Sequence, residues 1–199
     1  MHLRAPAILL AARQHGETAV VARLLTEQAG VVAGYIAGGR GRQLRPVIIP
    51  GNTVAAELRS RSDSQLPFAK LELIESRGPW LSEPLPAAAI GWACALTATA
   101  LPERHPYPSL WEALGGLLDA ICHAPSARGW ARALAGYEIL LLRELGYGGG
   151  ARIPEGELPE ILDVLGKLGD PIDQYLLADR RGDVMAARTR LLELLGRMA

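Results

Sequence analysis

The sequence predicts an α+β protein of two domains, an N-terminal five-stranded β-barrel of the OB type followed by an all-α helical bundle. Up to residue 78 the apolar residues alternate with period two, and beyond Trp80 the period changes to 3.6. A chain of 199 residues is long enough for two small domains, each with its own core. We therefore expect one domain at residues 1–78 and a second at residues 79–199.

The front part of the chain contains segments that have the alternating pattern of strands and end at turn residues. Five of them fit, at residues 5–12, 18–26, 31–37, 52–59 and 66–76. Short turns join the first three into a meander, and a longer excursion separates the third from the fourth. This order matches a small closed barrel of the OB type, and an SH3-like barrel is the alternative.

The rear part of the chain contains apolar stripes at helical spacing. They predict helices at residues 87–100, 109–123, 128–145, 158–168, 170–182 and 183–195. A capping box begins the second helix at Ser109, and Gly146 suits a left-handed cap after the third. Asp170-Pro171 and Asp183 are the expected starts of the last two helices. Residues 85–101 are uncharged, but a buried helix explains them better than a membrane span.

The formal net charge of zero hides an uneven distribution. Residues 1–78 contain ten basic and six acidic side chains, so their formal charge is +4, and the remaining residues carry −4. Cys94 and Cys122 are far apart in apolar surroundings, which argues against a disulfide framework or a zinc site. We expect a cytoplasmic protein that does not contact a membrane.

The segment between the third and fourth strands concentrates positive charge. Arg40, Arg42 and Arg45 lie within six residues among three glycines, and Pro46 ends the segment. Glycine allows close backbone approach to a ligand, and guanidinium groups match phosphate oxygens, so this segment is the predicted nucleic-acid contact. Further candidates at strand ends and on strand faces are Arg13, Arg59, Arg61 and Lys70.

Few aromatic side chains in the front part are available to stack on bases. Tyr35 is the candidate stacking platform. Phe68 could be a second platform, but it is the only phenylalanine of the chain, and we expect it instead to fill the barrel core. Binding would then be mainly electrostatic and nearly independent of base sequence.

The sequence contains none of the common catalytic or nucleotide-binding motifs, such as the P-loop, the dinucleotide fingerprint, the HExxH helix or the nucleophile elbow. We therefore predict no catalytic residues, no metal site and no cofactor. The acidic residues Glu155, Glu157, Glu160 and Asp163 are explained by the start of a helix, whose dipole favours negative charge.

Several short stretches together resemble the bacterial RecO family of recombination mediators. They are His15-Gly16-Glu17, Leu24-Leu25-Thr26 with Gly30, Gly38-Gly39-Arg40, Pro50-Gly51-Asn52, Leu71-Glu72-Leu73, Leu101-Pro102-Glu103 and Glu144-Leu145-Gly146-Tyr147. The resemblance implies an OB-fold that binds single- and double-stranded DNA, followed by a helical domain. It also implies strand annealing and the loading of recombinase onto DNA coated by single-strand-binding protein, together with RecR and often RecF, at the nucleoid.

The chain departs from the family pattern after the third helix. Many members have a four-cysteine zinc loop there, whereas residues 146–160 contain no cysteine, and the rear domain is shorter than in many members. In the helical part Arg128, Arg132 and Arg143 lie beside apolar positions. They are candidates to bind the acidic C-terminal tail of single-strand-binding protein as a charged rim around a hydrophobic pocket. Two alternatives remain, an adaptor that binds only proteins and an enzyme with an unrecognised site.

Overall fold

The computed structural model describes residues 2–62, 64–148, 150, 152–153, 155–178 and 184–198. The chain forms two compact units that are not simple halves of the sequence. Unit 1 contains Met1–Ser82 and Leu101–Trp111, and unit 2 contains Glu83–Ala100 and Glu112–Ala199.

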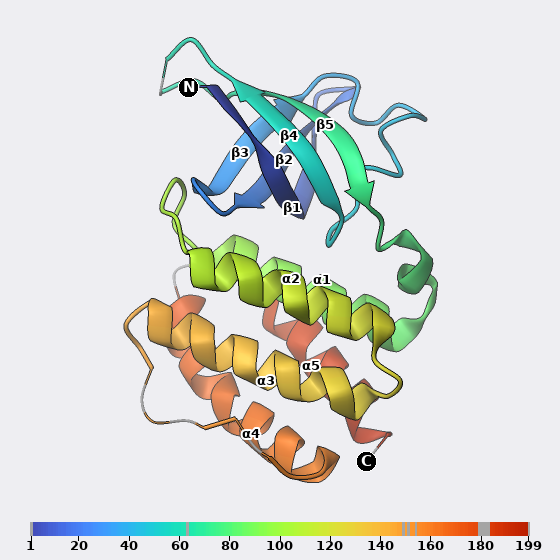
Figure 1. Cartoon of the computed structure of the whole chain (residues 1–199), viewed down its shortest axis with the longest axis vertical. Helices are drawn as coiled ribbons and strands as arrows, with labels where there is room; N and C mark the ends of the chain where they lie inside the picture. Colours follow the sequence, from blue (N-terminus) through green and yellow to red (C-terminus); the bar gives the residue numbers. More distant parts are fainter. Residues whose placement is uncertain are drawn as a thin grey trace. The chain divides into compact units, whose positions relative to one another are not determined.

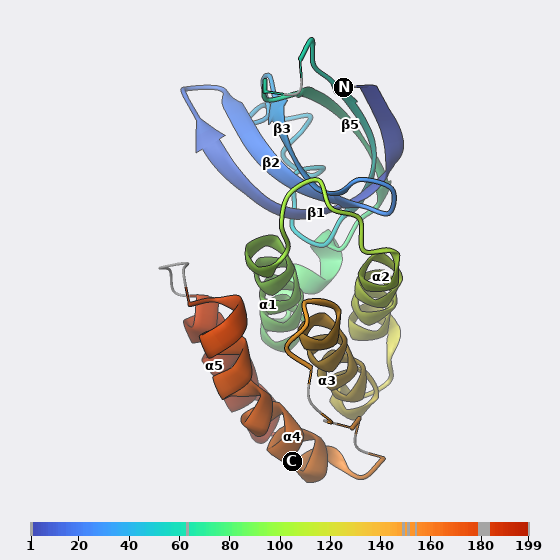
Figure 2. The same cartoon turned by 90° about the vertical axis from the view of Figure 1, so that its left-hand side faces the viewer.

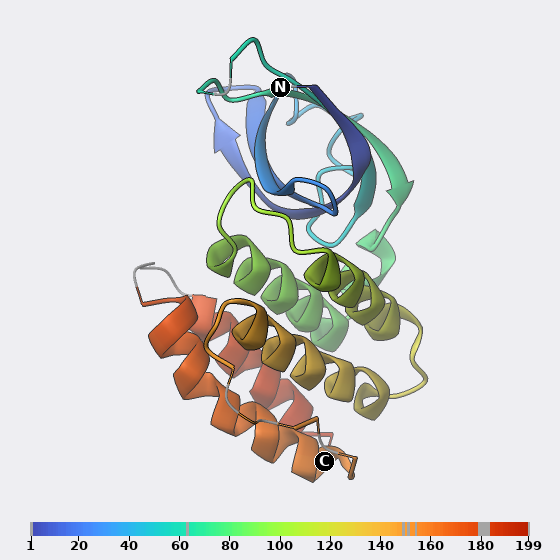
Figure 3. The same ribbon diagram turned by 60° about the vertical axis from the view of Figure 1, so that its left-hand side comes forward.

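Unit 1 is a closed five-stranded barrel (Figure 1). Its strands are β1 (His2–His15), β2 (Ala19–Thr26), β3 (Gly30–Ile36), β4 (Thr53–Arg59) and β5 (Phe68–Glu75). The spatial order is β1-β2-β3-β5-β4, with β4 pairing back onto β1, and Figure 3 allows the strands to be followed around the ring. All pairs are antiparallel except β3 with β5. The predicted OB-type barrel is confirmed.

The long strand β1 makes closure possible because it pairs with two neighbours. Its first half lies against β4, and its second half lies against β2, where the register shifts between Leu9 and Ala11 as at a β-bulge. Bulges bend a strand and increase its twist, as closure of a small barrel requires. Alternate residues of every strand fill the interior. The buried cluster is Ala7, Leu9, Ala22, Leu24, Val32, Ile36, Val54, Ala56, Leu58, Ala69 and Leu71.

A segment that follows the first helix completes unit 1. The Arg104 backbone N–H donates to the Val31 carbonyl oxygen at 2.8 Å, and Arg23 Nη1 lies 2.7 Å from Glu103 Oε1. Gly30, at the start of β3, has φ of +65°, and a Cβ there would overlap the backbone oxygen of His105. Glycine is therefore required at this position both for the backbone conformation and for the close approach.

Unit 2 is helical. After the short helix η1 (Gly78–Ser82), which belongs to unit 1, the helices are α1 (Pro84–Ala100), α2 (Pro108–His123), α3 (Ala127–Glu144), α4 (Leu158–Pro171), η2 (Ile172–Leu176) and α5 (Val184–Gly196). The helix α1 packs against α5, and α3 packs against α4 (Figure 2). Among the described residues, no helix combines the length and the apolar character needed to cross a membrane.

The ends of the helices agree with the sequence prediction in part. Gly146 has φ of +86°, and Tyr147 N–H donates to the Leu142 oxygen at 2.8 Å, which is the expected left-handed cap of α3. The helix α2 begins at Pro108, one residue before the predicted capping residue, because proline at the first turn lacks an N–H that would need a partner.

The predicted helix start at Asp170-Pro171 is wrong. The helix α4 runs through Asp170 to Pro171, and η2 follows with a wider turn at Ile172–Leu176. Pro171 and Ile172 both keep right-handed helical backbone, so the Asp-Pro pair lies inside a continuous helical segment instead of beginning one. The predicted start at Asp183 lies outside the described residues.

Candidate nucleic-acid interface

The loop between β3 and β4 carries Arg40, Arg42 and Arg45, and we call residues 38–46 the arginine loop. Successive turns shape it: Gly41 N–H donates to the Gly38 oxygen at 2.8 Å, and Arg45 N–H donates to the Gly41 oxygen at 3.1 Å. Gly38 has φ of +65°, which favours glycine. All three arginine side chains are exposed to solvent.

Apolar packing and one buried amide fix the loop on the barrel. Leu44, Val47 and Ile48 pack against the barrel core. The fully buried Asn52 donates through Nδ2 to the backbone oxygens of Pro46 and Val47, at 3.0 and 3.1 Å, and accepts the Arg77 N–H at 2.7 Å. The backbone that carries the arginines is therefore held at its C-terminal end.

The arginine loop has little internal charge compensation. Arg40 Nη1 donates to the Glu17 backbone oxygen at 2.6 Å, and the Arg40 N–H donates to the Thr18 oxygen at 3.1 Å. Within the described part of the chain, no carboxylate lies at ion-pair distance from Arg40, Arg42 or Arg45. Their charges are therefore available to an external polyanion.

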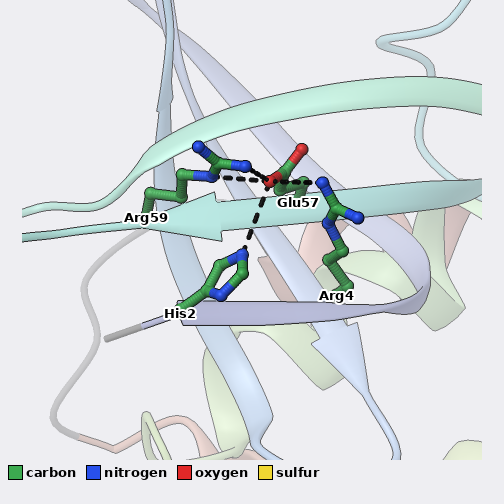
Figure 4. A network of polar contacts seen from close by, with 4 residues as sticks. All are labelled: His2, Arg4, Glu57 and Arg59. Atoms are coloured by element: carbon green, nitrogen blue, oxygen red, sulfur yellow. Dashed lines mark hydrogen bonds and ion pairs between the residues drawn. The ribbon is translucent and has the colours of Figure 1, made fainter.

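A second group of cations lies on β1 and β4 around Glu57 (Figure 4). His2 Nε2 lies 3.4 Å and Arg4 Nη2 lies 3.0 Å from Glu57 Oε1, and Arg59 also donates to this atom. Desolvation of the carboxyl group opposes ionisation, but the hydrogen bonds from Arg4, Arg59 and His2 outweigh it and lower the pKa of Glu57 from 4.5 to about 2. The single Glu57 carboxylate thus orients several cationic side chains but neutralises only part of their positive charge.

The remaining candidate cations lie at three places on the barrel. Lys70 on β5 lies opposite Glu57 of β4. Arg61 and Arg59 line a hollow of about 680 Å³ together with Phe68. Arg13 is exposed near the other end of β1, where it pairs with Val21. The sequence analysis did not include His2 or Arg4 among the candidates, since isolated charges at strand ends are common.

The expected position of Phe68 in the barrel core is wrong. Its side chain is 65% exposed and contacts the partly buried Tyr35, with ring centroids 5.2 Å apart. The alternation of side chains along the strand predicts the outward position. Ala69 and Leu71 face the core, so Phe68 lies on the outer face together with Lys70. Tyr35 also lies 5.8 Å from the His15 ring, edge to face.

The three candidate arginines of the helical unit do not form one site. Arg128 pairs with Glu157 at 2.9 Å, and it lines a hollow of about 350 Å³ together with Arg132. Arg143 lines a different hollow of about 660 Å³, whose walls include Ile139, Leu142, Leu168 and Lys167. Besides Arg143, two further cations, Arg152 and Lys167, line this hollow together with apolar side chains of α3 and α4.

Glu138 occupies a position that the helical pattern did not indicate. A glutamate is ordinarily exposed on a helix surface, whereas the structure buries Glu138 completely. It accepts a hydrogen bond from Trp92 Nε1 at 2.8 Å and pairs with Arg188 at 2.7 Å. Its role is therefore internal to unit 2. Among the described residues, no group of three or more His, Cys, Asp or Glu side chains is placed to hold a metal ion.

The fold and this surface define a small OB-type barrel protein with exposed cations and a second, helical unit. Comparison with known proteins identifies the family. The model of the family described as "Recombination protein O N terminal" matches residues 1–77, and the one described as "Recombination protein O C terminal" matches residues 82–148. The chain belongs to the RecO family of DNA repair proteins.

Individual relatives agree with this assignment. A protein from Rhodospirillum centenum named DNA repair protein RecO is 46% identical over 143 residues, which are 71% of this chain and 56% of the relative. Proteins of the same name from Phenylobacterium zucineum and Gluconacetobacter diazotrophicus are 38% and 37% identical over 74% of this chain. The matched part covers 60% and 59% of those two relatives, so it spans less than two thirds of each relative's length.

Proposed function

We propose that this protein is a non-enzymatic recombination mediator that acts on DNA at the nucleoid. In this role it binds single- and double-stranded DNA and anneals complementary strands. It also helps to load recombinase onto DNA coated by single-strand-binding protein, in concert with RecR and RecF. Membership of the RecO family supports a role in DNA repair, and the arginine loop supports DNA binding.

The observation that carries the proposal is the exposure of Arg40, Arg42 and Arg45 on one anchored loop, where no described carboxylate pairs with them. Annealing requires that the repulsion between two polyanions be screened while the base edges stay free. Guanidinium groups on an exposed loop can do this without covalent chemistry, because phosphate contacts release condensed counterions.

Salt titration tests DNA binding. We expect Arg42→Ala/Arg45→Ala to weaken oligonucleotide binding and to reduce the slope of log K against log salt by about 0.7 to 0.9 for each lost phosphate contact. Adding Arg40→Ala should reduce the slope further. The matched control is Arg190→Ala/Arg197→Ala, which removes two exposed arginines of unit 2 and should leave the slope unchanged. Equal slopes for the wild type and the triple variant would exclude the loop.

The hollow beside Arg143 is the proposed site for the acidic tail of single-strand-binding protein, since a basic rim around an apolar lining suits such a peptide. An annealing assay on bare and on protein-coated strands separates the two surfaces. Arginine-loop variants should slow both reactions, whereas Arg143→Ala should slow only the coated one. A protein that holds no oligonucleotide at moderate salt would instead support the alternative of a protein-only adaptor.

A further inference from the structure

Four side chains form a continuous row across the outer face of the barrel. His2 on β1 lies opposite Arg59 on β4, Arg59 lies opposite Phe68 on β5, and Phe68 lies opposite Tyr35 on β3. Residues directly opposite each other share one face of a sheet. Their sequence neighbours Leu58 and Ala69 face the core, so the row faces outward.

The middle of this row is aromatic. The Phe68 and Tyr35 rings meet at 5.2 Å and 78°, and Tyr35 meets the His15 ring at 5.8 Å and 87°. Perpendicular contacts of this kind hold each ring in a fixed orientation. Phe68 is nevertheless 65% exposed, although burial of a phenylalanine is favourable. We call His15, Tyr35 and Phe68 the ring cluster.

Cations lie at both ends of the ring cluster. At one end Arg59 and Arg61 line the hollow that Phe68 and Leu66 also line. At the other end Arg40 is tied to the turn after His15 through the backbone oxygens of Glu17 and Thr18, at 2.6 and 3.1 Å. The arginine loop, the three rings and the cations around Glu57 thus follow one another along the outer surface of the barrel.

The alternation of rings and cations indicates the chemistry of the ligand. A single-stranded polynucleotide offers a flat base and a phosphate in every unit, and every base can stack on an aromatic ring. In a duplex both faces of each base are already stacked, so its bases cannot reach the cluster. The guanidinium groups on both sides match a charged backbone more closely than an apolar peptide.

We propose that the ring cluster is a stacking site for unpaired bases of single-stranded DNA, with Arg59, Arg61 and Arg40 placed to contact the flanking phosphates. This inference rests on the proposed DNA-binding function and deepens it. It assigns base contact to the strands of the barrel, whereas the arginine loop supplies phosphate contacts that a single strand and a duplex can both use. The ring cluster is then a contact that only unpaired bases can make.

Normal and abasic oligonucleotides of equal length distinguish stacking from charge. We expect Phe68→Ala and Tyr35→Ala each to weaken binding of an oligothymidylate roughly five- to 150-fold, the range expected for one lost stacking contact. Binding of the abasic strand should not change. Phe68→Trp should restore binding of the normal strand. The matched control is Ile74→Ala, since Ile74 is another apolar side chain of β5 and is 57% exposed.

Fluorescence anisotropy at one salt concentration provides these affinities. Wild-type affinity in Phe68→Ala and Tyr35→Ala, or an equal loss on the normal and abasic strands, would overturn the stacking site while leaving the proposed function intact. A wild-type protein that binds neither strand would overturn the proposed function as well. Tight binding of an acidic peptide that depends on Phe68, without any effect on DNA, would show that the surface serves a protein.

Discussion

Glu57 shows how a single residue can organise a basic surface. Its Oε1 atom accepts hydrogen bonds from Arg4 and Arg59 and lies 3.4 Å from His2 Nε2 (Figure 4). Each of these side chains is exposed and would otherwise sample many rotamers. The carboxylate holds the cations on one side of β1 and β4. The two positive charges of Arg4 and Arg59 still exceed its single negative charge.

The lowered pKa of Glu57 has a consequence for stability against pH. The folded pKa is about 2, below the ordinary 4.5, so the cluster stabilises the fold fully above pH 4.5. This stabilisation is lost as the pH falls through the folded pKa. We expect the difference in unfolding free energy between the wild type and Glu57→Gln to be constant above about pH 5 and to shrink between pH 4.5 and about 2.

Urea denaturation at a series of pH values measures this difference. The control is Glu72→Gln, which removes another carboxylate of the outer barrel surface. A difference between wild type and Glu57→Gln that stays constant down to pH 2 would show that the network does not form in solution.

At the scale of the elements, one buried carboxylate joins four helices of unit 2. Glu138 on α3 accepts from Trp92 on α1 and pairs with Arg188 on α5. Arg188 in turn donates to the Leu165 oxygen on α4. Glu138 is fully buried and Arg188 is 3% exposed, so each charge depends on its partner.

Removing one partner of this pair should destabilise the helical unit strongly. We expect Arg188→Leu to lower the free energy of unfolding by about 3–5 kcal/mol, because it leaves the Glu138 carboxylate buried without its counter-ion. The double variant Glu138→Leu/Arg188→Leu should recover a large part of the loss, since no unpaired charge remains. Arg190→Leu, at an exposed position of the same helix, is the control.

Urea unfolding of unit 2, followed by helical circular dichroism, provides the comparison. The single variant Glu138→Leu completes the comparison. If the double variant loses as much unfolding free energy as Arg188→Leu and Glu138→Leu lose together, the two side chains do not act as a pair. That result would contradict the geometry of the buried network.

At the scale of the whole molecule, sequence periodicity predicted the barrel, its strand number and α1 to α3. The alternation of core residues extends over several strands, and each apolar stripe extends over several helical turns. Many positions therefore support the same secondary-structure prediction. Residues 101–107 show no such pattern, because they meet the barrel at one bridge between Val31 and Glu103 rather than along a full strand. Local patterns do not encode a contact of this kind.

Part of the candidate surface could likewise be predicted from the sequence, and part could not. Clustering of glycine and arginine indicated the arginine loop from sequence alone. The outward position of Phe68 was missed because residue type was given more weight than its place in the strand period. The meeting of His2, Arg4 and Arg59 at Glu57 depends on the register of β1 against β4, and a single sequence does not fix that register.

Residues 101–111 belong to unit 1, although the segments before and after them belong to unit 2. This leads to a last prediction about local stability. The Arg104 amide lies between two helices in sequence, but it donates to Val31 of β3. We therefore expect its hydrogen exchange to follow the barrel and not the helices. Gly30→Ala should destabilise the barrel by at least about 1–2 kcal/mol, the cost of a left-handed non-glycine residue. The overlap with the His105 oxygen adds to this cost.

Native-state hydrogen exchange with residue resolution measures these effects. In Gly30→Ala the amides of Arg104 and of β2 and β3 should exchange faster by the same factor, whereas amides in α3 and α4 should keep their wild-type rates. Gly16→Ala is the matched control, since Gly16 has φ of +63° but no atom within 4 Å of the added Cβ, so only the conformational cost remains. Exchange at Arg104 that follows the α2 amides instead would place residues 101–111 with the helices, because a segment reports the cooperative unit in which its hydrogen bonds break.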